Sequence, residues 1–373
     1  MRKKLLTFAA IGMLATATMT ACDNSAQTSA ASSSTTTIGK GDGKSRVGVI
    51  LPDAKSSARW TTDDLKYLKE AFAAANVPAE IENAQGDRAA FVKIAENMVN
   101  SGVKVLVIAN LDSISGRTAL QLARAKKIPT IDYDRLTLNG GADYYVSFDN
   151  VEVGQKQAYG LEKCLGGSKV ASPVIAELNG SPTDNNATLF KQGYDGVLQD
   201  GYDDSAYLKG PDQSVPDWDN DEGGVIFAQM LSQRADINGV LAANDGLAGA
   251  VIKVLKKHGL NGKVPVTGQD ATVAGLQAIL AGDQCVTIYK AIKPEAQAAA
   301  GVAIKLYKGD KPQLPANAKL KDPESGAYVP FISLAPVSID KTNVKYVLNE
   351  GFVTKKELCT AAYVTACNNA GIK

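Results

Sequence analysis

The chain has 373 residues, with 40 basic and 39 acidic side chains, one histidine and five cysteines. A net charge of +1, without a run rich in Lys and Arg, gives no reason to expect nucleic acid as a partner. The single histidine, and cysteine spacings that match no zinc motif, argue against a metal site. We also expect no cofactor, because no glycine-rich phosphate loop is found at the strand ends described below.

The N-terminus has the three-part pattern of a secretory signal. Basic residues 2–4 precede an apolar run from Leu5 to Met19, and Cys22 follows closely. The run is too short for a comfortable transmembrane helix of ~20 residues. We therefore expect residues 1–21 to be a lipoprotein signal peptide and Cys22 to carry lipid, although an ordinary signal with an incidental cysteine is the alternative. The mature protein would be secreted and anchored to the outer face of the cell membrane by its lipid alone.

Residues 22–45 are rich in Ser, Thr, Gly and Ala, and they hold few large apolar side chains. Such a segment cannot bury enough surface to fold, so we expect a flexible tether. The remainder of the chain is longer than the ~250–300 residues at which a single core stops growing. Two lobes are therefore expected.

From Val47 the chain alternates short apolar runs with amphipathic segments of helical spacing. This repeated βα pattern predicts a mostly parallel sheet with helices on both faces. The strands expected first are 47–51, 79–83, 103–109, 129–133 and 144–148, and the helices between them are 63–75, 87–101 and 115–127.

The same pattern restarts after Asn150. Expected strands are 170–179, 206–209, 239–243, 264–267, 286–289 and 331–334, and expected helices are 153–165, 186–198, 223–233, 246–258, 272–281 and 294–307, followed by a helical or irregular tail.

The helix after Lys290 fits best on the first sheet, and a further crossing near 333–336 would return the chain. The fold expected is α/β, with two doubly wound parallel-sheet lobes joined by a hinge of three crossovers. The N-terminal lobe would comprise residues 46–148 and 291–331, and the C-terminal lobe residues 149–290 and 332–373.

Four cysteines remain after Cys22, an even number in an oxidising compartment. Three pairings are possible. We favour Cys359–Cys367, which would staple the C-terminal segment locally, with Cys164–Cys285 as the remainder. Free buried thiols are the alternative.

Polar and aromatic side chains follow the predicted strands, at the edge where ligands bind in such sheets. Carboxylates and amides accept hydrogen bonds from sugar hydroxyls, cationic side chains donate to them, and tryptophan rings pack against the apolar faces of a pyranose. One tryptophan in each lobe could sandwich a sugar ring. The candidate ligand-binding residues are Arg59, Trp60, Asp134, Arg135, Asp184, Asn186, Trp218, Asn244, Asp270 and Lys290.

Each candidate also has a simpler interpretation. Asp184 and Asn186 could simply cap the helix that follows them, and Asn244 or Asp245 could do the same for the helix from Gly246. Asp134 and Arg135 could form a lone ion pair, and the tryptophans could be packing residues. The joint placement of these side chains at strand ends favours a binding site.

In several segments the chain resembles the bacterial xylose-binding proteins of ABC importers, in the ribose/galactose-binding superfamily. The resemblance runs from about Val47 to Phe352. The segments that carry it are Ala58-Arg59-Trp60, Tyr133-Asp134-Arg135, Val146-Ser147-Phe148-Asp149-Asn150, Gly180-Ser181-Pro182-Thr183-Asp184-Asn185-Asn186-Ala187, Ala243-Asn244-Asp245, Gly268-Gln269-Asp270-Ala271 and Ile288-Tyr289-Lys290.

The resemblance implies a monomeric solute-binding protein that captures a monosaccharide, xylose or a related pentose or hexose, between two lobes and delivers it to an ABC permease. By the same resemblance, Arg59, Trp60 and Arg135 would contact the sugar from the first lobe. Asp184 and Asn186 would close on it from the second, with Asn244, Asp270 and Lys290. The sequence of the loop around Trp218 differs from that expected for the family, so the resemblance supports Trp218 less firmly than the other residues.

Three other classes share parts of this pattern. A transcription regulator of the lactose-repressor type has the same core, but the export signal contradicts it. A secreted glycosidase would need a pair of carboxylates such as Asp134, Asp184 or Asp270. Because Asp134 lies beside Arg135, ionised acceptors are favoured over a proton donor, and we expect no enzymatic activity. A sensory binding protein that serves a membrane receptor would use the same cleft and stays open as an alternative.

Overall fold

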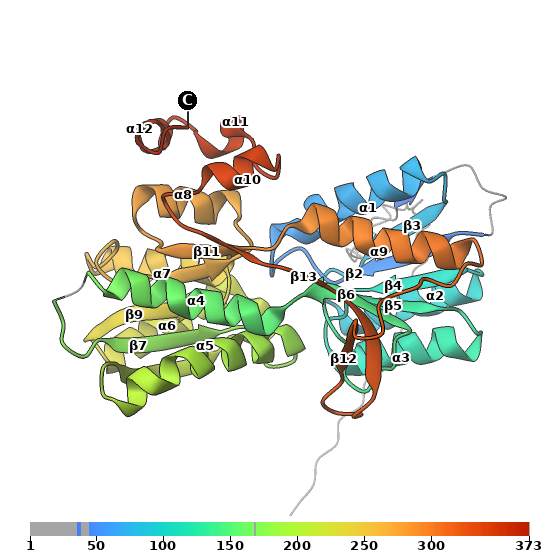
Figure 1. The fold of residues 1–373 in the computed structure, drawn as a ribbon, viewed down its shortest axis with the longest axis horizontal. Coiled ribbons are helices and arrows are strands. Elements are labelled where there is room, and N and C mark those ends of the chain that lie inside the picture. The colour runs from blue at the N-terminus through green and yellow to red at the C-terminus, as the bar shows by residue number, and fades with distance from the viewer. Residues whose placement is uncertain (1–35, 39–44, 168, 373) are drawn as a thin grey trace, which may run out of the picture. The chain divides into compact units, whose positions relative to one another are not determined.

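The structure is a computed structural model that describes residues 36–38, 45–167 and 169–372 (Figure 1). The predicted signal peptide, Cys22 and most of the predicted tether lie outside the described residues. Within the described part, βα units form one eight-stranded and two three-stranded sheets. No helix of this part is long and apolar enough to cross a membrane.

The eight-stranded sheet has the strand order β1-β3-β2-β4-β5-β6-β13-β12. Its central strands pair in parallel, and antiparallel strands close both edges. Strands β2 and β4 are continuous buried apolar runs, as is typical of a sheet covered on both faces. The strands are β1 (Thr36–Ile38), β2 (Val47–Leu51), β3 (Ala79–Asn83), β4 (Val105–Ile108), β5 (Thr130–Tyr133), β6 (Tyr144–Phe148), β12 (Lys319–Lys321) and β13 (Tyr328–Leu334).

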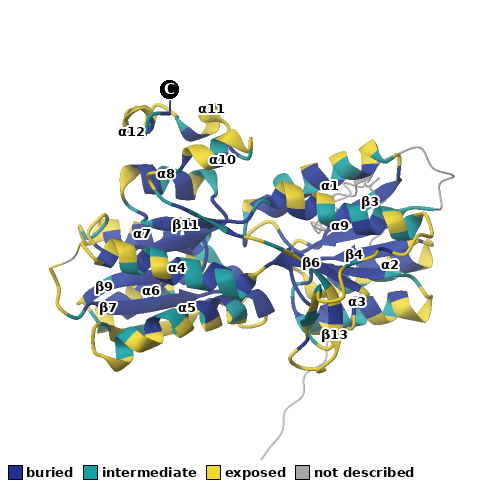
Figure 2. Ribbon diagram, in the orientation of Figure 1, coloured by how far each residue is buried: buried dark blue, intermediate teal, exposed yellow. Residues whose placement is uncertain are grey.

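Helices cover both faces of this sheet (Figures 1 and 2). Helices α1 (Asp63–Ala74) and α9 (Ile292–Tyr307) pack on one face, where Phe72 and the alanines of α9 are buried against the strands. Helices α2 (Arg88–Asn100) and α3 (Ser113–Ala125) cover the other face. The buried faces follow the helical periodicity expected from the sequence.

Two smaller sheets, ordered β8-β7-β9 and β10-β11-β14, form the second α/β unit. A single parallel bridge between Val240 and Val266 links them. The buried Gln157 amide also donates to the carbonyls of Ala242, Ala243 and Gly268, each at 3.2 Å. The strands are β7 (Val174–Asn179), β8 (Leu208–Ser214), β9 (Ile237–Ala242), β10 (Thr267–Gln269), β11 (Val286–Tyr289) and β14 (Val337–Ile339).

The helices of this unit pack as pairs, α4 against α5 and α6 against α7. A separate apolar cluster joins α8 to the C-terminal segment. The helices are α4 (Asn150–Leu165), α5 (Asn185–Asp203), α6 (Asn220–Gln233), α7 (Asp245–Lys257), α8 (Val273–Ala281), α10 (Lys345–Asn349), α11 (Lys355–Leu358) and α12 (Val364–Asn369), with short 3-10 helices η1 (Ala58–Thr61) and η2 (Pro216–Trp218).

The chain passes between the two α/β units three times. It leaves the first after β6, returns after β11 to form α9, and leaves again after β13, because β14 pairs with β11. The three crossovers predicted from the sequence are therefore present.

Several strands differ from the prediction. Residues 22–45 were expected to form only a tether, but Thr36–Ile38 pairs antiparallel with β3, because β3 offers an open edge and β-branched residues suit a strand. Strand β8 begins at Leu208 and extends to Ser214, and the first strand of the second unit begins at Val174 instead of Val170. Strands β12 and β14 were not predicted.

The four described cysteines form two disulfides. Cys164 is joined to Cys285, with the Cα atoms 6.5 Å apart, and Cys359 is joined to Cys367, with the Cα atoms 5.9 Å apart. The first links α4 to the start of β11, and the second closes the α11–α12 segment. These are the two pairs that the sequence analysis favoured.

Candidate functional site

A small cavity of about 30 Å³ lies where the strand ends of the two units meet. All ten candidate residues line it, so the structure brings together every predicted side chain; their contact with a ligand stays a prediction. The lining comprises Ser56, Ser57, Arg59, Trp60, Asp134, Arg135, Asp184, Asn186, Phe190, Trp218, Asn244, Gln269, Asp270 and Lys290.

Apart from Phe190 in the second turn of α5, each lining residue lies at or just past the carboxyl end of a strand or begins the next helix. Arg59 and Trp60 lie in η1 after β2, and Asp134 and Arg135 follow β5. From the second unit, Lys290 and four further polar residues follow β11, β7, β9 and β10. Parallel strands place these ends on one edge of a sheet, so two such edges supply one cavity.

Asp184 combines helix capping with contacts in the cavity. Its Oδ1 accepts a hydrogen bond from the backbone N–H of Asn186 at 2.9 Å and so caps α5. Its Oδ2 accepts from Trp218 Nε1 at 3.1 Å and lies 3.0 Å from Arg135 Nε. The capping interpretation is therefore correct but incomplete, because the second oxygen ties an arginine of the first unit to a tryptophan of the second.

Asn244 also has two roles. Its Oδ1 caps α7 by accepting from the N–H of Leu247 at 2.9 Å. Its amide nitrogen lies 3.5 Å from the carbonyl oxygen of Ser56 in the first unit. The Asn244 amide thus faces the opposite wall of the cavity.

Asp134 is surrounded by donors. Its Oδ2 accepts from Lys290 Nζ at 2.8 Å and from Arg59 Nη1 at 3.0 Å, and its Oδ1 accepts from Asn186 Nδ2 at 3.2 Å. Burial alone would raise the pKa of Asp134, but the positive charges of Lys290 and Arg59 outweigh it and hold that pKa well below its ordinary value. Asp134 is therefore an ionised acceptor and cannot serve as a proton donor near neutral pH.

Asp270 is in a different electrostatic environment. Burial raises its pKa against the opposing charge of Lys290. Its Oδ1 contacts the Gln269 amide, and its Oδ2 lies 3.4 Å from Ser57 Oγ. Fewer cationic side chains contact Asp270 than Asp134, so the Asp270 oxygens have more free capacity to accept hydrogen bonds from a ligand.

Three lining residues have the left-handed backbone that non-glycine residues rarely adopt: Asp134 (φ 62°), Trp218 (φ 57°) and Asp270 (φ 102°). Such conformations cost of order 1–3 kcal/mol each and concentrate at functional sites. Three such residues in one cavity indicate that the surrounding structure holds these backbones in an unfavourable conformation and thereby directs their side chains into the cavity.

The two tryptophans have different surroundings. Guanidinium carbons of Arg59 and Arg135 lie over the Trp60 ring, 4.4 and 5.3 Å from its centroid, and the Trp60 Nε1–H is buried without a partner among the described residues. Trp218 packs edge-on to Phe190, with ring centroids 6.5 Å apart. A Cβ at Gly180 would overlap the six-membered ring of Trp218, so this ring depends on the glycine for its position.

The lining contains acceptors, charged and amide donors, and apolar ring surface, which suit a neutral polyhydroxyl compound. None of the fourteen lining side chains is a histidine or cysteine. The Asp134 and Asp184 carboxylates are each bound to a cationic side chain. Among the described residues no cluster of His, Cys, Asp and Glu could hold a metal ion.

Four lining residues were not among the candidates. Phe190 lies one helical turn after Asn186, so the periodicity of α5 could have revealed it. Gln269 directly precedes Asp270 at the same strand end. Ser56 and Ser57 precede Arg59 in a loop with no distinctive pattern, and nothing in the sequence marked them.

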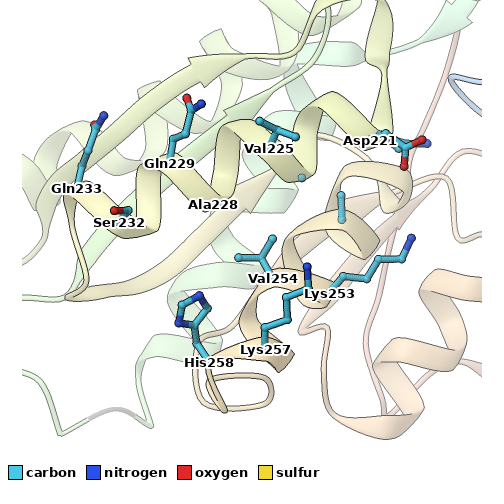
Figure 3. Close-up of a pocket in the computed structure, with 13 residues that line it drawn as sticks. Asp221, Val225, Ala228, Gln229, Ser232, Gln233, Lys253, Val254, Lys257 and His258 are labelled. Atoms are coloured by element: carbon cyan, nitrogen blue, oxygen red, sulfur yellow. The ribbon is translucent and has the colours of Figure 1, made fainter.

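A larger groove, of about 660 Å³, lies between α6 and α7 (Figure 3). The labelled side chains include Val225, Lys253, Lys257 and His258, and the exposed lysines and histidine lie along one helix. The groove shares no residue with the cavity at the strand ends. Its polar groups do not converge on a point, so it does not resemble a small-molecule site.

Comparison with known proteins gives consistent results. Residues 47–311 match the model of the periplasmic binding protein domain. The chain is 33% identical over 317 residues to a D-xylose-binding periplasmic protein of Escherichia coli, covering 84% of this chain and 92% of that protein. It is 35% identical over 324 residues to a multiple sugar-binding periplasmic receptor of Rhizobium radiobacter, covering 83% of this chain and 90% of that protein.

A solved structure of an ABC transporter solute-binding protein from Clostridium phytofermentans, with bound β-D-glucose, superposes with a TM-score of 0.76 at 28% identity. The match covers 84% of this chain and 99% of that chain. The predicted two-lobe fold with a three-crossover hinge is confirmed by this likeness and by the sheet topology. The chain belongs to the periplasmic binding protein family and has the type I fold.

Proposed function

We propose that this protein is a solute-binding protein that captures a monosaccharide in the cavity between its lobes and delivers it to an ABC permease. One observation carries the proposal: ten polar and aromatic side chains from seven strand ends, drawn from both units, converge on one small cavity. The relatives named for binding xylose and several sugars, and the relative solved with glucose, support the same ligand class.

The proposal extends to the lobes themselves. The N-terminal lobe comprises residues 46–148 and 291–331, and the C-terminal lobe residues 149–290 and 332–373. The cross-lobe bond from Asn186 to the backbone oxygen of Asp134, 3.0 Å long, supports closure of the two lobes around the site. Sugar stabilises the closed form only as far as it binds that form more tightly than the open one.

Xylose or a related pentose or hexose is the proposed ligand. The protein acts as a monomer. It has no enzymatic activity in this proposal, because the lining carboxylates Asp134 and Asp184 are already paired with cationic side chains. Outside the described residues, the signal at 1–21 directs export and Cys22 carries the lipid that anchors the protein to the outer face of the membrane.

A thermal-shift screen of D-xylose, other pentoses and hexoses tests the ligand class, because a ligand at 100 times its Kd stabilises the folded state by about 2.7 kcal/mol. Isothermal titration calorimetry then measures the affinity of each sugar that raises the melting temperature. No shift with any monosaccharide would contradict the proposal. Release of a chromophore from aryl glycosides would instead identify a glycosidase.

A further inference from the structure

Arg59, one of the proposed sugar contacts, is enclosed by three carboxylates. Its Nε donates to Asp64 Oδ2 at 2.7 Å, and its Nη2 donates to Asp64 Oδ1 at 2.8 Å and to Glu295 Oε2 at 2.7 Å. Its Nη1 donates to Asp134 Oδ2 at 3.0 Å. All four residues are buried, with at most 5% of each exposed.

A guanidinium has five N–H groups in a rigid fork. Four of the five are used by Asp64, Glu295 and Asp134, and none of the described residues accepts the fifth, which is on Nη1. Arg59 lines the cavity. The donor that is left for a ligand therefore belongs to the nitrogen beside Asp134, another lining residue.

Asp64 and Glu295 lie behind Arg59 and are not part of the cavity wall. Asp64 lies in the first turn of α1, and the Tyr133 hydroxyl donates to it from β5. Glu295 is in the first turn of α9, five positions after Lys290, although 236 positions separate it from Arg59. One carboxylate close to Arg59 in sequence and two distant ones thus fix this side chain.

Glu295 is poorly suited to a role in stability. It is fully buried among apolar residues of α9, including Ile292, Ala296 and Ala299, and its Oε1 has no partner among the described residues. An unpaired buried polar atom is unfavourable for folding. Because Asp64 and Asp134 together already balance the charges of Arg59 and Lys290, the fold does not require a third carboxylate there.

We propose that Glu295 and Asp64 are positioning residues for sugar binding, which hold the Arg59 guanidinium so that its remaining N–H faces the ligand. This inference rests on the proposed function. It assigns a specific role to two residues that do not line the cavity. They fix the orientation of the Arg59 guanidinium, so that one of its five N–H groups stays available to the ligand.

The test compares Glu295→Met, which has a similar volume but no strong acceptor, with Glu295→Gln, which keeps an acceptor oxygen. Calorimetry with D-xylose and D-glucose is expected to show about a tenfold loss of affinity for the methionine variant and near wild-type affinity for the glutamine variant. The melting temperature without sugar should change little in either. Glu177→Met is the matched control, because Glu177 is equally buried and is paired with Lys191 away from the cavity.

A second readout separates positioning from general packing. Monodeoxy analogues of D-xylose identify the hydroxyl that Arg59 contacts, since the affinity penalty for removing that hydroxyl disappears in Arg59→Met. The same penalty should shrink in Glu295→Met and persist in Glu177→Met. If Glu295→Met does not fold, Asp64→Asn replaces it, because it also removes an acceptor from Arg59.

Wild-type affinity and an undiminished deoxy penalty in the Glu295→Met variant would overturn the inference. Equal losses in the Glu295→Met and Glu177→Met variants, or a glutamine variant as weak as the methionine one, would do the same. A wild-type protein that binds neither sugar contradicts the proposed function itself, so the two failures are distinguishable.

Discussion

Gly180, directly after β7, allows the Trp218 ring to reach the cavity. A methyl group added there would lie well inside the ~3.5 Å contact distance of carbon atoms in the six-membered ring. The ring would have to move by roughly 1–2 Å, which breaks its 3.1 Å hydrogen bond to Asp184. Overpacking of this kind typically costs about 1–3 kcal/mol.

In the Gly180→Ala variant without sugar, the displaced ring occupies space that the ligand needs. Sugar must push the ring back against the new methyl group, so we expect affinity to fall about tenfold or more. Calorimetry with D-xylose and D-glucose measures the loss. The intrinsic fluorescence of the two tryptophans, Trp60 and Trp218, should change when the Trp218 ring is displaced, and in a Trp60→Phe background the signal comes from Trp218 alone.

Gly249→Ala is the matched control, because a Cβ at this helical position of α7 meets no atom within 4 Å. Alanine should stabilise that helix slightly and leave sugar affinity unchanged. If Gly180→Ala binds sugar as tightly as Gly249→Ala and shows the same emission spectrum, the argument about Trp218 is wrong.

Three further predictions follow from single contacts. Arg135→Ala removes the cross-lobe pair with Asp184 and should cost roughly 2 kcal/mol, or about thirtyfold in affinity by calorimetry; an unchanged Kd would refute its place in the site. Burial raises the pKa of Asp132 to about 7. Between pH ~4 and ~7 the folded state therefore retains a proton that the unfolded chain loses, so the free energy of unfolding falls as the pH rises. In Asp132→Asn the melting temperature should change less between pH 5 and pH 8 than in the wild type. The same change in both proteins would contradict the prediction. The Cys164–Cys285 bond spans 121 positions, so Cys164→Ser should destabilise the protein by about 5 kcal/mol in chemical denaturation; a loss below about 1 kcal/mol would refute that entropic estimate.

The candidate site could be predicted because of sheet geometry. In parallel sheets the carboxyl ends share an edge, so residues as distant as Arg59 and Lys290 could be assigned to one place without knowledge of their contacts. The way in which they are paired could not be predicted. Asp134 lines the cavity, where its contact with a ligand stays a prediction, and its oxygens also accept from Lys290, Arg59 and Asn186, a set of partners that no local pattern encodes.

Edge strands account for most of the fold that the sequence analysis missed. Strand β8 contains Gly210 and Pro211, and most of its side chains are exposed, so it shows neither an apolar run nor alternation. Strands β1, β12 and β14 have three residues each, too few for periodicity to be measured. Such strands form because a neighbouring strand offers unpaired backbone groups, which no local pattern encodes.

The three crossovers between the lobes have a mechanical consequence. Lobes joined by one connection could twist and swing in many directions, whereas three separate connections restrict these motions. The open protein then samples few orientations, so little rotational freedom is lost when sugar holds it shut. Lys290 lies in one of these connections and bonds Asp134 in the cavity, so this connection between the lobes contributes directly to the proposed sugar site.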